Sequence, residues 1–191
     1  MTLRLLTISL AVCAAIARAQ VGEASLSFGT SQFKNSSLGR DSGIDYRMKG
    51  GFRMGARLTL NTTRFFGHEF GYGYTRSKIT ATGVANIGMT THQGFYNYLV
   101  YATPEGSPVR PFAAGGGHFS SYYPPGTSVS YGNGVTKFGV NYGGGIKVKV
   151  SPMFAIRFDV RDYINPKPFD LPGKSGWLRM LELAAGWALI F

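Results

Sequence analysis

Hydrophobic and polar residues alternate along most of the chain after position 20. Between Phe138 and Val150, every second residue except Gly144 is aromatic or aliphatic, and the intervening positions carry glycine, asparagine or lysine. The segment from Phe154 to Arg161 repeats the pattern with Arg157 and Asp159 on the polar face. Successive side chains of a strand point to opposite faces, so this period of two predicts β-structure. No window with helical spacing of apolar residues extends beyond two turns. The chain is therefore predicted to be all-β.

The alternation divides into eight predicted strands. Their ranges are 21–32, 46–60, 65–77, 91–103, 109–121, 136–150, 153–164 and 177–191. At about 11–15 residues, most are longer than the ~5–6 residues typical of soluble proteins. They are long enough for a tilted strand that crosses a bilayer, which needs about 9–11 residues. Strand length thus favours a membrane-spanning barrel.

The predicted connections alternate between short and long. The short ones are 61–64, 104–108 and 151–152, and the long polar ones are 33–45, 78–90, 122–135 and 165–176. Outer-membrane barrels have short periplasmic turns and longer external loops. The pattern predicts an eight-stranded, antiparallel, up-and-down transmembrane β-barrel with both termini in the periplasm.

Composition agrees with this fold class and excludes others. Charged residues make up 15 % of the chain and the mean hydropathy is −0.01, which is too polar for a helical membrane protein. A barrel gives such intermediate values because only alternate residues face lipid. The single cysteine, Cys13, lies in the segment expected to be removed, so disulfides and thiol chemistry are excluded for the mature protein. The formal charge of +11 indicates anionic partners such as lipopolysaccharide phosphates or, alternatively, only a charged solvated or lumenal surface.

Residues 1–19 have the three parts of a signal peptide. Arg4 is basic, the run from Leu5 to Ile16 is apolar, and Ala17-Arg18-Ala19 precedes Gln20 as a cleavage site. The apolar run is too short for a transmembrane helix. Lipidation at Cys13 is a weak alternative, because the preceding residue is normally small and Val12 is not. The expected organisation is a signal peptide over 1–19 and an exported barrel domain over 20–191.

The polar strand faces are predicted to line the lumen and the apolar faces to contact lipid. A soluble, lipocalin-like barrel would have the inverse arrangement, but the polar faces are rich in glycine and short of the residues that coat a solvated surface. Eight strands enclose a space that side chains can fill. The predicted lumen charge network comprises Arg53, Arg57, Glu69, Lys147, Arg157, Asp159, Arg161 and Glu182, with Glu23 a further candidate. Buried charges must be paired or hydrated, so a plug of salt bridges is expected, and a narrow anion-preferring path is the alternative.

Two hairpin registers follow from the predicted turns. A hairpin folded about Thr63 places Arg57 opposite Glu69. A turn over 151–153 places Lys147 opposite Arg157, with Asp159 one diagonal step away.

Several motifs resemble those of the OmpA-type outer-membrane β-barrel family. They are the stretches 109–117 (VRPFAAGGG), 143–152 (GGGIKVKVSP), 154–163 (FAIRFDVRDY) and the terminal WALIF. The resemblance covers the whole mature chain and implies the barrel domain alone, without a periplasmic C-terminal domain. It implies membrane anchoring, adhesion or envelope integrity, with no shared catalytic residue. Trp187, Leu189 and Phe191 resemble the signal read by the barrel-assembly machinery.

One pair of residues suggests catalysis. Lipid A deacylases of the outer membrane use a His and a Ser two positions apart, as His118 and Ser120 are here, with the His activating the Ser. In those enzymes an Asn follows the serine, whereas Ser121 follows here. Polar residues near the outer rim are the alternative interpretation of this pair. His68, His92 and His118 have no ligand-like spacing, so neither a metal nor another cofactor is predicted.

The favoured function is a non-enzymatic outer-membrane barrel of the Gram-negative envelope that presents its loops outside. A lipid A-modifying enzyme and a narrow small-solute channel are the alternatives. Expected partners are outer-membrane lipid, lipopolysaccharide and the barrel-assembly machinery; nucleic acid is not expected, and the protein is expected to be a monomer. Aromatic girdles are predicted at the two membrane interfaces. Their members are Tyr122, Tyr123, Tyr163 and Trp177 at the long-loop end, and Phe65, Phe66, Tyr101 and Phe191 at the short-turn end.

Overall fold

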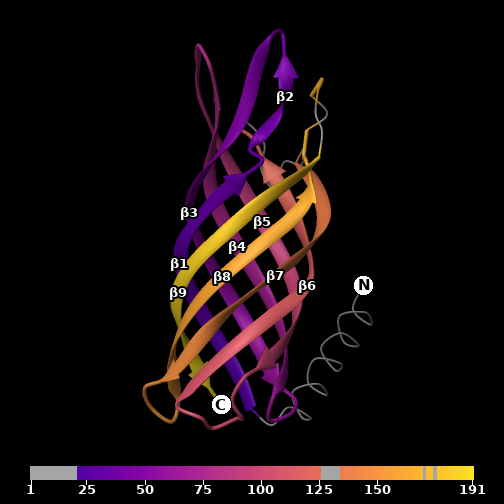
Figure 1. The fold of residues 1–191 in the computed structure, drawn as a ribbon. Helices are drawn as coiled ribbons and strands as arrows, with labels where there is room; N and C mark the ends of the chain where they lie inside the picture. Colours follow the sequence, from indigo (N-terminus) through magenta and orange to yellow (C-terminus); the bar gives the residue numbers. More distant parts are fainter. Residues whose placement is uncertain (1–20, 126–133, 170, 174–175) are drawn as a thin grey trace, which may run out of the picture.

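The computed structural model describes residues 21–125, 134–169, 171–173 and 176–191 (Figure 1). The predicted signal peptide therefore lies outside the described residues. The strands are β1 (Val21–Lys34), β2 (Ser37–Asp41), β3 (Ile44–Asn61), β4 (Phe66–Ala81), β5 (Val84–Tyr101), β6 (Val109–Tyr123), β7 (Val135–Lys149), β8 (Phe154–Pro166) and β9 (Trp177–Ile190). No helix in the described part of the chain is long and apolar enough to cross a membrane.

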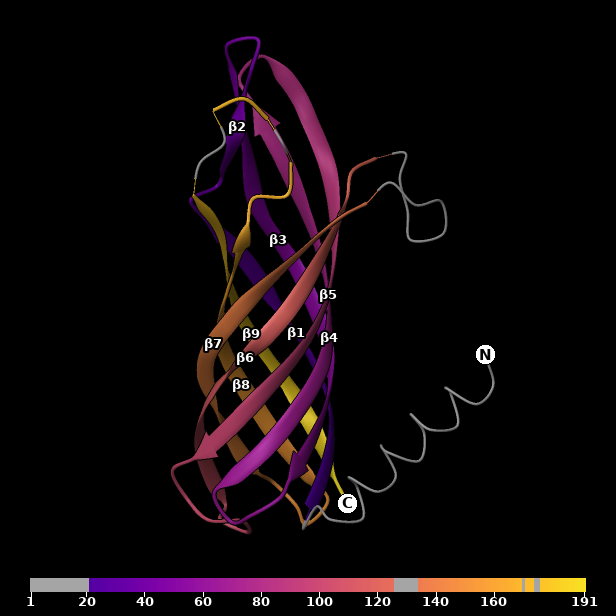
Figure 2. The same cartoon turned by 90° about the vertical axis from the view of Figure 1, so that its right-hand side faces the viewer.

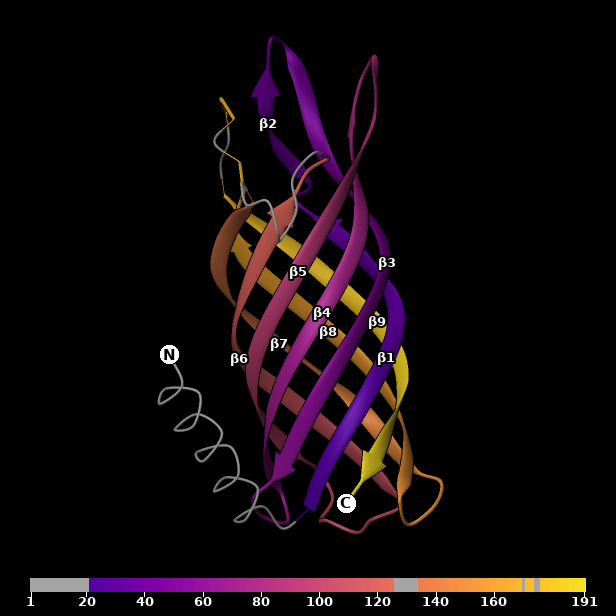
Figure 3. The same ribbon diagram turned by 180° about the vertical axis from the view of Figure 1, so that it is seen from behind.

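Eight of these strands form a closed antiparallel barrel. The sheet order is β1-β9-β8-β7-β6-β5-β4-β3-β2, and β1 also pairs with β3, which closes the circle. Figure 3 shows β1 between β9 and β3. The described C-terminus lies at the same end as the short turns (Figure 1). The predicted fold class is confirmed.

The first two long connections are hairpins, which corrects the prediction of loops over 33–45 and 78–90. β2 pairs only with β3, across a turn in which Ser42 and Gly43 have positive φ values of 48° and 81°. This conformation is that of a type I′ turn, which suits a two-residue hairpin. β4 and β5 continue to pair up to Ala81 and Val84. The tips of these hairpins are exposed at successive positions, as at Thr82, Gly83, Ala85 and Asn86, so they lack the alternation that marks the rest of each strand.

The two hairpins project beyond the rim of the barrel. Pairing between β5 and β6 begins only at Thr90 and Tyr123, so the first six residues of β5 have a partner on one side only. Figures 1 and 2 show β2, β3, β4 and β5 extending past the other strands at the long-loop end.

The lumen at the long-loop end is closed by an apolar cluster that the sequence did not predict. Its buried members are Leu38, Met48, Ile79, Met89, Tyr122 and Leu178. Phe169 and Leu171, from the connection between β8 and β9, pack against it. The predicted polar loop over 165–176 therefore contributes apolar side chains to a plug. Farther along the lumen lie charged residues, and a second cluster of Leu99, Tyr101, Phe112 and Ala114 follows toward the short turns.

Large apolar side chains cover the outside of the barrel. Examples are Leu26, Phe28, Phe158, Val160 and Leu183, each at least 40 % exposed. The girdle prediction is partly wrong, since Tyr101, Tyr122 and Tyr163 are buried inside the barrel. Tyr101 shares its face with Leu99, Tyr122 with Ser120, and Tyr163 with Arg161, because alternate residues of a strand lie on one face. The other predicted members with exposed rings are Phe65, Phe66, Trp177 and Phe191.

Candidate functional site

The candidate site is the charged middle of the lumen. The eight residues of the predicted charge network each have 4 % or less of their surface exposed. They come from five strands: β3 provides two, β4 one, β7 one, β8 three and β9 one. All eight lie on the inner face, where alternation placed them.

Glu69 of β4 is the centre of one group of contacts. Its carboxylate lies 2.6 Å from Arg157 Nη1, 2.9 Å from Arg161 Nη2 and 4.0 Å from Arg57 Nε. Asp159 completes the group, because Arg157 donates to it through Nε at 2.7 Å and Nη2 at 2.9 Å. Two carboxylates thus neutralise the adjacent guanidinium groups of β8.

Glu182 of β9 is the centre of the second group. Its carboxylate lies 2.9 Å from Arg53 Nε and accepts a hydrogen bond of 2.7 Å from Arg57 Nη2. The Tyr163 hydroxyl donates to the other oxygen at 2.9 Å. Charge-assisted hydrogen bonds of this kind are about twice as strong as neutral ones. Arg57 lies between Glu69 and Glu182 and therefore connects the two groups.

A third group lies nearer the short turns. Lys147 Nζ donates to Glu23 Oε2 at 2.5 Å and to the Tyr101 hydroxyl at 2.9 Å. Arg110 stacks over the Tyr101 ring at 3.7 Å and pairs with Glu105 at 2.7 Å. Arg110 was not predicted to belong to the lumen. It is separated from His118 and Ser120 by an even number of positions along the strand, so alternation would have placed it on the same inner face.

The two predicted registers have different outcomes. Lys147 does lie opposite Arg157, and the pair avoids repulsion because Lys147 turns to Glu23 and Arg157 to Glu69. The other register is wrong by two residues: Arg57 lies opposite Gly71, and Glu69 opposite Thr59. A shift by two leaves every side chain on its original face. Arg57 and Glu69 are consequently still neighbours in the lumen, at 4.0 Å rather than in direct contact.

The His118 and Ser120 side chains also point into the lumen and are buried. His118 Nε2 lies 3.4 Å from Asn165 Oδ1, and its ring meets the edge of Tyr163. Ser120 accepts a hydrogen bond from Gln93 at 2.8 Å. Within the described part of the chain, neither residue contacts a carboxylate. An acyl substrate in the bilayer lies on the other side of the wall, so this geometry does not suit a deacylase.

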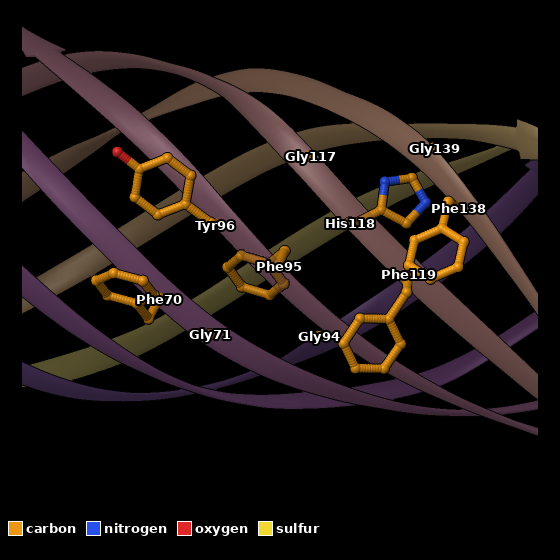
Figure 4. Close-up of a pocket in the computed structure, with 10 residues that line it drawn as sticks. All are labelled: Phe70, Gly71, Gly94, Phe95, Tyr96, Gly117, His118, Phe119, Phe138 and Gly139. Atoms are coloured by element: carbon orange, nitrogen blue, oxygen red, sulfur yellow. The ribbon is translucent and has the colours of Figure 1, made fainter. Parts of the chain in front are cut away.

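An apolar groove of about 580 Å³ lies on the lipid side of that wall (Figure 4). Phe70, Tyr96, Phe119 and Phe138 border it, and glycines of β4 to β7 form much of its floor. A Cβ at Gly71 would lie only 2.1 Å from the Phe95 ring, so that glycine makes room for an inward aromatic side chain. His118 and Phe95 approach the groove from the inner side of the wall.

The lumen is suited to structural ion pairs. The pocket beside Glu23, Arg110 and Lys147 has a volume of about 20 Å³, which is room for about one water. Among the described residues, no three His, Cys, Asp or Glu side chains form a group that could hold a metal ion.

Comparison with known families agrees with this geometry. Residues 2–187 match the model of the family described as outer membrane protein beta-barrel domain. The chain belongs to this family. As an outer membrane barrel it spans the bilayer through its strands, and the resemblance inferred from the motifs is confirmed.

Solved structures share the fold of this outer membrane barrel. Neisserial surface protein A is 18 % identical, with a TM-score of 0.60, over 89 % of this chain and 97 % of that one. OprG of Pseudomonas aeruginosa is 10 % identical, with a TM-score of 0.56, over 90 % and 94 %. Ail of Yersinia pestis, in complex with the heparin analogue sucrose octasulfate, is 14 % identical, with a TM-score of 0.52, over 89 % and 99 %. No curated protein matches the sequence.

Proposed function

We propose that this barrel is a non-enzymatic protein of the outer membrane that presents structured hairpins at the cell surface, in adhesion or in support of envelope integrity. The observation that carries the proposal is the filled lumen. An apolar cluster closes one end, paired charges fill the middle, and a second apolar cluster lies toward the short turns, so the barrel offers a rigid support rather than a passage. The projecting parts of β2–β3 and β4–β5 are the surfaces that this support holds in place.

The orientation is part of the proposal. With the short turns in the periplasm, the two hairpins and the β8–β9 connection lie outside the cell. Residues 1–19 act as the signal peptide for export. Trp187 and Leu189 lie on the outer face of the last strand, and the exposed Phe191 directly follows it, where the barrel-assembly machinery can reach all three during assembly. The protein acts as a monomer surrounded by lipid and lipopolysaccharide.

Protease treatment of intact cells tests orientation and surface presentation. Cleavage is expected at the hairpin turn over 41–44 or within 122–135 and 165–176, and not at 61–64, 104–108 or 151–152. A tagged cytoplasmic protein serves as the control for lysis. Cleavage at the short turns of intact cells would refute the orientation.

Planar bilayer recordings test the sealed lumen. The purified barrel is expected to show no steady conductance, because each central cation is held by a carboxylate. A matched variant, Glu69→Ala, removes a central counter-ion and serves to reveal whether the network is what closes the path. Steady anion-selective conductance of the unmodified protein would favour the channel hypothesis instead.

A further inference from the structure

A polar pocket of about 570 Å³ lies at the long-loop end, between the start of the β2–β3 hairpin and the β8–β9 connection. It is separate from the lumen network and from the groove of Figure 4. Its lining residues are Asn35, Ser36, Ser37, Arg47, Lys167, Gly176 and Trp177. The pocket thus brings together two stretches that are far apart in the sequence, 35–47 and 167–177.

Local hydrogen bonds fix the hairpin side of the pocket. Asn35 has a positive φ of 52° and turns the chain between β1 and β2. The Ser36 carbonyl accepts from the Met48 amide at 2.8 Å. Asp45 accepts from the Ser37 hydroxyl at 2.6 Å and from Arg47 Nε at 2.7 Å. These contacts hold Arg47 at the edge of the pocket before any ligand arrives.

The charge of the pocket is positive. Its lining includes two cations, Arg47 and Lys167, and no carboxylate. The nearby Asp45 is paired with Arg47. The hydrogen bond from Ser37, and to a smaller extent the one from Arg47, lower the pKa of this carboxyl. The hydrogen bond from Arg47 to Asp45 uses Nε. Because the guanidinium has five N–H donors, its terminal nitrogens can bind a further anion.

The remaining lining residues match the chemistry of a sugar. Trp177 is 56 % exposed and offers an aromatic surface. It lies across the strand pair from Pro166, directly before Lys167. The hydroxyls of Ser36 and Ser37 and the amide of Asn35 can exchange hydrogen bonds with ring hydroxyls. Pockets that combine an apolar surface with a few placed polar groups are typical of small-molecule sites.

We propose that this pocket binds an anionic saccharide, with Arg47 and Lys167 on its phosphate or sulfate groups and Trp177 under a sugar ring. The inference deepens the proposed surface role and rests on it for access to the outside. Two sources provide this chemistry: the phosphorylated core of lipopolysaccharide in the same membrane, and a sulfated glycan on another surface.

Binding is measured in solution with the full chain in zwitterionic phosphatidylcholine nanodiscs, which leave both ends of the barrel accessible. The probes are a heparin-derived sulfated disaccharide, deacylated lipopolysaccharide, and a neutral disaccharide as a control. The variants are Lys167→Met, Arg47→Gln and Trp177→Leu. Lys149→Met, at the exposed short-turn end, removes the same charge away from the pocket. Arg47 is exposed, so Arg47→Gln keeps the test valid if Lys167→Met does not fold.

Each pocket variant is expected to weaken binding of the anionic probe about tenfold, the effect of losing one hydrogen bond to a charged group or one stacking contact. Lys149→Met is expected to bind as the unmodified protein does. Binding of the lipopolysaccharide probe alone assigns the pocket to the membrane's own glycolipid, and binding of the sulfated probe alone assigns it to an external glycan. The proposal is overturned if neither anionic probe binds, if the neutral sugar binds equally well, or if Lys149→Met weakens binding as much as the pocket variants do. Binding in nanodiscs does not depend on the orientation of the barrel in the cell. A failure of the saccharide proposal is therefore distinguishable from a failure of the proposed surface orientation, which the protease experiment tests.

Discussion

Glu69→Gln is expected to be among the most destabilising isosteric changes in the lumen. Glu69 is fully buried, and its carboxylate contacts Arg157 and Arg161 directly. The amide keeps the shape but removes the charge, so these guanidinium groups keep Asp159 as a shared counter-ion. Removing one partner of a buried ion pair costs about 3–5 kcal/mol, because the remaining charge is left uncompensated. We expect a loss of that order in the free energy of unfolding.

Double-mutant cycles locate this energy in particular pairs. Arg157→Met with Glu69→Gln, and Arg57→Met with Glu182→Gln, both break direct contacts of 2.6 and 2.7 Å. Coupling in the upper part of the range of about 0.5–3 kcal/mol is expected for both. Arg57 with Glu69 is separated by 4.0 Å and is expected to couple more weakly. The ranking follows from distance, since the charged atoms of the first two pairs are more than 1 Å closer than those of Arg57 and Glu69.

The assay is reversible urea unfolding in lipid vesicles, followed by tryptophan fluorescence. Trp187 is 49 % exposed on the outer face of β9, so its emission changes when it leaves lipid. Lys34→Met, an exposed position at the end of β1, is the control and should change stability by less than about 0.5 kcal/mol. A loss below about 0.5 kcal/mol for Glu69→Gln, or equal coupling in all three pairs, would refute a dry, specifically paired network.

Three further changes test the wall and the terminus. Phe158→Arg, which faces lipid at mid-strand, should reduce the free energy of unfolding in vesicles by about 2–4 kcal/mol, whereas Leu58→Arg near the short turns should cost about 0–1; a silent Phe158→Arg would invert the assignment of faces. Gly71→Ala should cost about 1–3 kcal/mol in the same assay, because its Cβ would meet the Phe95 ring at 2.1 Å. The control Gly117→Ala, whose Cβ has its nearest neighbour at 3.9 Å, should be nearly neutral, and equal effects of the two changes would contradict the packing described for the barrel wall. Phe191→Ala should lower the amount of protein assembled in the outer membrane more than it lowers stability, and normal levels on blots of membrane fractions would remove the residue from the assembly signal.

The alternation of apolar and polar residues predicted most of the fold. It separated inner from outer residues correctly at Arg157, Asp159 and Glu182, because one face meets lipid along the whole membrane-spanning length. Alternation did not predict the parts of β4 and β5 beyond the rim of the barrel. At the tip of this hairpin both faces meet water, so the sequence from Thr80 to Asn86 does not alternate and resembles a loop. Alternation also cannot detect a hairpin shift of two residues, and this explains the error at Arg57 and Glu69.

The candidate site could be predicted from the sequence only in part. The inner charges follow from parity, but their partners depend on which strands face each other across the lumen. Glu23 of β1 and Lys147 of β7 are 124 positions apart and make a direct contact. The apolar plug depends on Phe169 and Leu171 folding back over the barrel mouth, and no local pattern in a loop encodes that return.

The positions of the carboxylates along the chain have a consequence for the order of assembly. An open sheet of β3 to β8 contains Arg53, Arg57, Lys147, Arg157 and Arg161, with Glu69 and Asp159 as its inner carboxylates in the membrane-spanning middle. The balancing charges, Glu23 and Glu182, are on the first and last strands. Their long-range contacts form only when the ends of the chain meet, and an unpaired cation in hydrocarbon is costly. Closure and insertion should therefore be a single kinetic event, with a half-inserted open sheet too high in energy to accumulate.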